Sequence, residues 1–141
     1  MFDNNVYVLC RKKLVGNMLI TIGMYHKIFR NRDDAIAEMK SVKSLRDYHI
    51  MRSFIAGDAD VKKAYIFTYK CIAGFWNPET ADRLHFDCHF HSNPNMTRLR
   101  MQVDAENNGL SIYRHTADFN RMSAKSSTKV WAYRLRSFDV V

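Results

Sequence analysis

Proline and glycine are scarce in this chain of 141 residues, which has two prolines and five glycines. Flexible linkers are usually rich in such residues, so the sequence predicts a single domain over residues 1–141. No apolar run approaches the ~20 residues that a membrane helix needs, and the start of the chain lacks the pattern of an export signal. The three cysteines form no CxxC pair, which fits a reducing compartment. We therefore expect a cytoplasmic protein with no membrane partner.

Familiar catalytic and nucleotide-binding motifs are also missing. The chain contains no Walker loop, no GxGxxG, no GxSxG, no zinc-finger spacing and no aromatic RNP motif. These absences favour a binding protein and leave an enzyme as the alternative.

Positive charge is in excess. The formal net charge is +8 with the six histidines counted as neutral, and no run of five like charges forms a basic tail. A basic folded surface favours an anionic partner, either nucleic acid or an acidic protein surface. The alternative is that the charge serves solubility alone.

Alternating segments separated by turn signals predict strands along most of the chain. They cover residues 6–11, 18–22, 63–72, 97–103, 110–115 and 130–138. Asn31 is a suitable N-cap for a main helix over about residues 32–47, and Thr116 for a short helix over about 117–122. The sequence thus predicts an α+β fold: a mostly antiparallel sheet of hairpins and meanders, with the main helix packed on it.

Residues 83–92 concentrate titratable side chains. On an extended strand, one face would be apolar and the other would carry His85, Asp87, His89 and His91. Side chains two residues apart on such a face can converge on one ion, so the segment is a candidate Zn²⁺ or Mn²⁺ site. No metal is favoured, because polar side chains ordinarily cover the solvated face of a sheet.

Arginines on two further strands extend this candidate surface. A hairpin at residues 92–95 would place Arg98 and Arg100 beside the histidines, and Arg134 and Arg136 would join them if the last strand lies on the same side. Guanidinium groups bind phosphate through paired hydrogen bonds. The leading hypothesis is a non-enzymatic protein that binds its anionic partner through an Arg/His sheet face comprising Arg98, Arg100, Arg134, Arg136, His89 and His91.

Two other functions stay open. A small phosphodiesterase or nuclease would use His85, His89 and His91 as catalytic residues, with or without a metal held by these histidines and Asp87. An inhibitor or assembly subunit would bind through the loop that contains Phe75 and Trp76, since an exposed tryptophan is a frequent binding hot spot. Nothing in the sequence indicates the oligomeric state.

Overall fold

A computed structural model describes residues 4–74 and 83–141. In chain order its elements are β1 (Asn5–Val15), β2 (Met18–Phe29), α1 (Arg32–Ser41), the 3₁₀ turn η1 (Lys43–Leu45), β3 (Tyr48–Ala56), β4 (Lys63–Gly74), β5 (His85–Phe86), β6 (Phe90–His91), α2 (Pro94–Asn107), β7 (Ser111–His115), β8 (Arg121–Lys125) and β9 (Lys129–Val140). Within these ranges, neither α-helix has the length and apolar content to cross a membrane.

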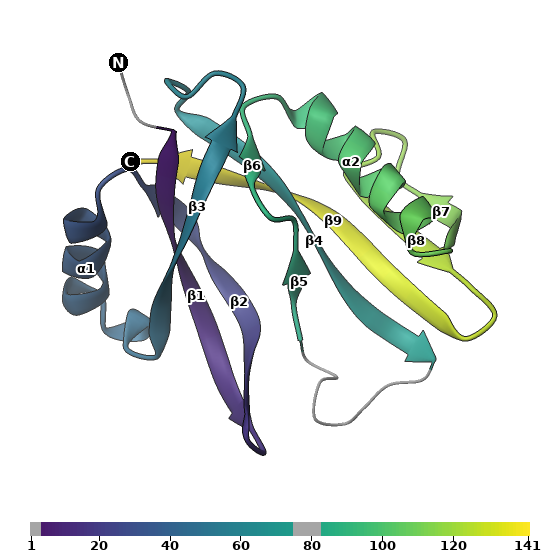
Figure 1. The fold of residues 1–141 in the computed structure, drawn as a ribbon, viewed down its shortest axis with the longest axis horizontal. Coiled ribbons are helices and arrows are strands. Elements are labelled where there is room, and N and C mark those ends of the chain that lie inside the picture. The colour runs from purple at the N-terminus through teal and green to yellow at the C-terminus, as the bar shows by residue number, and fades with distance from the viewer. Residues whose placement is uncertain (1–3, 75–82) are drawn as a thin grey trace.

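Six strands close into a mixed barrel in the order β4-β6-β3-β1-β2-β9, with β9 returning to β4 (Figure 1). Two pairings are parallel: β2 with β9, which aligns Lys27 with Asp139, and β3 with β6, which aligns Ile55 with Phe90. The predicted antiparallel meander with one main helix is therefore wrong. Alternation along a segment identifies a strand but carries no information about a distant parallel partner.

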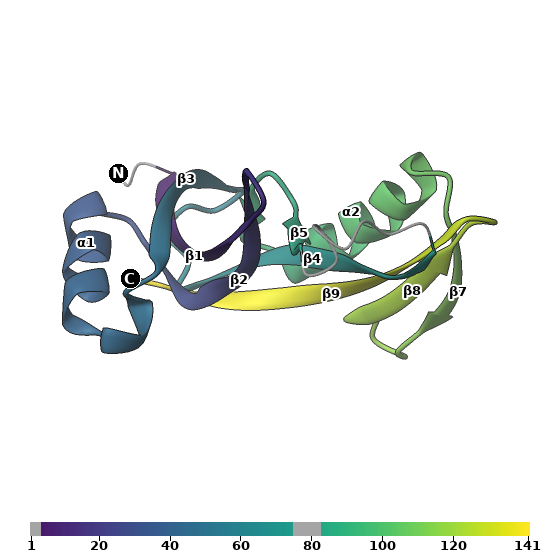
Figure 2. The same cartoon turned by 90° about the horizontal axis from the view of Figure 1, so that it is seen from below.

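Two apolar cores flank the β4–β9 pair. The barrel is filled by a cluster that includes Val8, Ile66 and Phe138. On the outer face of the same two strands, α2 covers a second cluster that includes Phe67 and Tyr133. Figure 2 shows α2 on one side of this sheet and the β7–β8 hairpin curving toward the other. The β4–β9 pair thus has one face against α2 and one face toward the barrel.

The first helix begins at the predicted residue but ends earlier than predicted. The Asn31 side chain accepts a hydrogen bond of 2.8 Å from the Asp33 backbone N–H, as an N-cap should. The helix stops at Ser41 instead of about residue 47, because Val42 adopts an extended conformation (φ −103°, ψ 110°). Beyond it, η1 carries Leu45 into the core, where its exposure is 1%.

Residues 97–103 form part of α2 and not the predicted strand. The Asn93 side chain accepts a hydrogen bond of 2.9 Å from the Asn95 backbone N–H, and Pro94 occupies the first turn, where a missing N–H costs nothing. The sequence predicts a hairpin turn at residues 92–95, but asparagine and proline also occur at the start of helices. Gly109 ends this helix with φ +71°.

The short helix predicted over residues 117–122 is absent. Residues 117–120 belong to the turn between β7 and β8, and Arg121 and Met122 begin β8. The Asp118 carboxylate accepts hydrogen bonds from the Thr116 hydroxyl (2.7 Å) and the Asn120 backbone N–H (3.0 Å). Such local side-chain bonds compete with helix formation.

The extended strand predicted over residues 83–92 is broken in the middle. Of residues 83–92, only the two-residue strands β5 and β6 pair with β4, and the chain bends between them. At the bend the Asp87 carboxylate accepts a 2.8 Å hydrogen bond from the Cys88 backbone N–H. The alternation therefore fails, with Asp87 buried and Cys88 exposed.

The helical register of α2 predicts which substitutions cost stability. Met101 is 0% exposed and Leu99 is 53% exposed. We expect Met101→Ala to lower the free energy of unfolding by about 2–5 kcal/mol and Leu99→Ala by less than about 0.5 kcal/mol. Urea unfolding followed by circular dichroism measures both. Equal costs would contradict the helix, because a strand would place both side chains on one face.

Candidate functional site

The bend between β5 and β6 meets α2 in a polar cluster, which we call the Arg100 cluster: Asp87, Cys88, His89 and Arg100. The Arg100 Nη2 atom donates to Asp87 Oδ1 at 2.6 Å and lies 3.6 Å from Cys88 Sγ. Its Nη1 atom lies 3.2 Å from His89 Nε2. One guanidinium therefore contacts all three residues of the bend.

These contacts fix the protonation of His89. Because a guanidinium only donates, His89 Nε2 must accept, and the ring proton then resides on Nδ1. Nδ1 lies 3.0 Å from Cys88 Sγ. Burial and the charge of Arg100 lower the pKa of His89. Burial, His89 and Arg100 likewise lower the pKa of His91, so both imidazoles are held neutral near pH 7.

Several polar atoms of this region are buried without a hydrogen-bond partner among the described residues. They are Asp87 Oδ2, His91 Nε2 and Arg100 Nε. The residues Asp87 and His91 are each only 7% exposed. A buried polar group without a partner costs free energy unless water or a ligand satisfies it.

A metal ion has a suitable donor set here. The ligand atoms of Asp87, Cys88 and His89 lie within 4.8 Å of one another, so this group could hold an ion. This set differs from the predicted one. His85 does not belong to the set, because its ring stacks on that of Tyr69 at a centroid distance of 4.9 Å. Cys88 belongs to the set although it was not among the predicted ligands. The His91 ring lies 4.7 Å from that of His89.

The predicted pairing of Arg98 with Arg100 on a sheet face is wrong, because both residues lie on α2. Arg98 donates to Asn120 Oδ1 at 2.9 Å and to Asn95 Oδ1 at 2.6 Å. It thus ties the helix to the β7–β8 turn, while Arg100 binds the bend.

Arg134 and Arg136 lie on the opposite face of the sheet from α2. Tyr133 packs against that helix, so Arg134, the next residue of β9, points the other way. Arg136 shares this face, and its guanidinium lies 5.4 Å from the ring of Phe138 in the barrel core. The structure therefore separates the predicted Arg/His face into two sites on opposite sides of the sheet.

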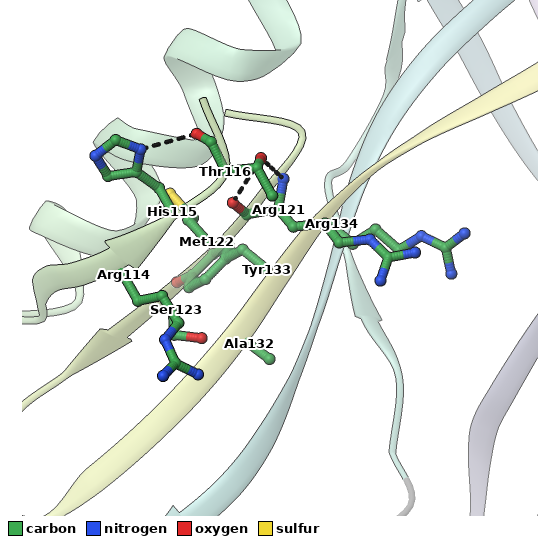
Figure 3. Close-up of a pocket in the computed structure, with 9 residues that line it drawn as sticks. All are labelled: Arg114, His115, Thr116, Arg121, Met122, Ser123, Ala132, Tyr133 and Arg134. Carbon is green, nitrogen blue, oxygen red and sulfur yellow. Dashed lines mark hydrogen bonds between the residues drawn. The ribbon is translucent and has the colours of Figure 1, made fainter. Parts of the chain in front are cut away.

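Arg134 has a partner that the sequence did not reveal. In the β8–β9 register Arg134 stands directly opposite Arg121. Figure 3 shows the two side chains running side by side, with Arg114 near Ser123 on the same pocket. Within the described part of the chain, no carboxylate forms an ion pair with Arg114, Arg121 or Arg134. Like charges directly opposite one another destabilise a sheet.

Three adjoining hollows extend this surface. The first hollow has a volume of about 480 Å³ and is lined by Arg121 and Arg134. Arg134 also lines the second hollow, of about 330 Å³. Lys70 lines both the second hollow and the third, which has a volume of about 520 Å³. We call the three together the basic groove. Asp47 is the one acidic side chain among the described residues that line it. Its lysines and arginines are Arg114, Arg121, Arg134, Arg136, Lys70, Arg11, Lys12 and Lys13.

Arg121 was missed because it lies within residues 117–122, which the sequence predicts to be a short helix. The alternation of polar Arg121, Ser123 and Lys125 with apolar Met122 and Ala124 is the signal that would have found β8. Phe75 and Trp76 lie outside the described residues.

Comparisons with models of protein families, with curated proteins and with solved structures find no match.

Proposed function

We propose that this protein binds a nucleic acid strand along the basic groove. The observation that carries the proposal is the cross-strand pair of Arg121 and Arg134, whose charges no carboxylate balances among the described residues. A phosphate group between the two guanidiniums would relieve their repulsion and accept hydrogen bonds from both.

The length of the groove favours a polymer over a single small anion. Cationic side chains line all three hollows, from Arg114 on β7 to Lys12 on β1. A nucleic acid presents phosphates at regular intervals and can engage such a row at several points. Guanidinium forks match the geometry of phosphate groups.

Removing the arginine pair should weaken binding to single-stranded RNA. We expect Arg121→Gln with Arg134→Gln to lower affinity and to reduce the slope of log K against log salt by roughly 0.7, because the two arginines share one phosphate and each phosphate contact contributes about 0.7. Fluorescence anisotropy across a salt series measures both quantities.

The matched control removes two exposed arginines outside the groove, Arg32→Gln with Arg52→Gln. An equal loss of affinity in this control would show that net charge, and not the groove, governs binding. Polyglutamate that competes as well as RNA would instead indicate an acidic protein partner.

Reversing one charge of the pair separates folding from binding. In Arg121→Glu the new carboxylate stands opposite Arg134, so we expect the free energy of unfolding to rise by about 0.2–1 kcal/mol. RNA affinity should fall in the same variant, because a phosphate would now meet a negative charge. Urea unfolding and anisotropy on one preparation report the two effects. A less stable variant would contradict the proposed repulsion.

We also propose Zn²⁺ as the ion for the Asp87, Cys88 and His89 group, in preference to Mn²⁺. The donor set combines sulfur, imidazole nitrogen and carboxylate oxygen within 4.8 Å. Sulfur and imidazole suit zinc, whereas manganese prefers oxygen ligands.

Elemental analysis of protein prepared without an affinity tag tests this second proposal. We expect zinc to bind at about one ion per chain and to be lost in Cys88→Ser, whose hydroxyl is a poor zinc ligand. Manganese in excess of zinc would contradict it. RNA and DNA cleavage assays on the same samples test the hydrolase hypothesis, which stays a prediction.

A further inference from the structure

Arg100 already supplies a positive charge to the residues that would bind zinc. Its guanidinium lies 2.6 Å from Asp87 Oδ1, 3.2 Å from His89 Nε2 and 3.6 Å from Cys88 Sγ. An arginine guanidinium is not deprotonated in proteins. The guanidinium therefore stays charged at every relevant pH.

A divalent ion and this guanidinium repel each other at such short range. Two cations a few ångströms apart in a partly buried site are strongly unfavourable. The ion would also compete for the lone pairs of Asp87 and for the sulfur of Cys88 that now face Arg100. Occupation of the site by zinc thus requires the guanidinium to leave.

We propose that Arg100 is a tethered competitor for the metal, so that zinc binding to Asp87, Cys88 and His89 displaces its guanidinium from the bend. This inference rests on the zinc proposal above. It makes the contact between α2 and the β5–β6 bend depend on metal, because Arg100 is the α2 residue that holds Asp87 by an ion pair.

The charges balance in both states. With zinc absent, the Arg100 cation neutralises the Asp87 carboxylate. With zinc bound, the Asp87 carboxylate and the Cys88 thiolate neutralise the dication, and the thiol proton passes to solvent. The His89 proton moves from Nδ1 to Nε2, which Arg100 has vacated, so that Nδ1 beside Cys88 Sγ can bind the ion.

The buried atoms without partners support an exchange at this place. Asp87 Oδ2 makes no hydrogen bond to any described residue, so this oxygen is available to bind an ion. Asp87 is 7% exposed, which makes an unsatisfied carboxylate oxygen costly in the metal-free state.

Zinc titration against a chelating indicator dye tests the inference on the full chain. We expect Arg100→Gln to bind Zn²⁺ at least about tenfold more tightly than the unsubstituted protein, because the competing cation is gone and Asp87 is left without its partner. Arg100→Lys should fall between them. The control is Arg98→Gln on the same helix, whose guanidinium binds Asn95 and Asn120 and not the bend.

A second readout follows the reactivity of Cys88 instead of the indicator dye. In the unsubstituted protein, saturating zinc should protect Cys88 from alkylation by iodoacetamide, as measured by mass spectrometry, and protection should require less zinc in Arg100→Gln.

The outcomes separate this inference from the zinc proposal. Equal zinc affinity with and without Arg100 would overturn the competition and leave the zinc site standing. Zinc binding by Arg100→Gln alone would support the competition and overturn zinc as the ion of the native protein. Binding by none of the variants would overturn both.

Discussion

The pairing of β4 with β9 is the constraint on which both candidate sites depend. The two strands run antiparallel from Lys63 opposite Asp139 to Gly74 opposite Lys129. One face of this ribbon packs on α2, and the other enters the barrel and continues into the basic groove. Since successive residues of a strand alternate between faces, the positions of Tyr133 and Arg134 follow from the same register.

The two groups of cations differ in their partners. On the side of α2, Arg98 and Arg100 are bound to acceptors of the protein itself, namely two asparagines and Asp87. On the opposite face, Arg121 and Arg134 face each other. Arginines with internal partners stabilise the fold, whereas arginines that repel each other leave their hydrogen-bonding capacity for a ligand. This contrast is why we propose the groove, and not α2, as the binding surface.

Local signals predicted much of the secondary structure. Gly16 and Asn17 form the turn between β1 and β2, where Gly16 has φ +60°, and Asn31 caps α1 as expected. The failures arose where one pattern fits two structures. Asn93 and Pro94 suit a turn as well as the start of a helix, and α2 begins there. Parallel pairings between distant strands left no trace in the sequence.

The candidate site was found in part. The segment around His85 to His91 was singled out by its density of titratable groups, and it does contain the Asp87, Cys88 and His89 group. Cys88 was assigned to the apolar face because strict alternation was assumed. The ion pair of Asp87 with Arg100 joins the bend to α2. The sequence predicts a strand for this part of α2, so the ion pair could not be predicted.

The most direct test of the proposed groove is an NMR titration of the arginine side-chain Nε–Hε resonances with a short single-stranded RNA. Arg134 and Arg98 lie on opposite sides of the same sheet, so each reports on one face. Our account predicts that Arg114, Arg121, Arg134 and Arg136 shift together and saturate at one affinity while Arg98 stays unchanged. Shifts confined to Arg98 and Arg100, or no shift at all, would contradict it.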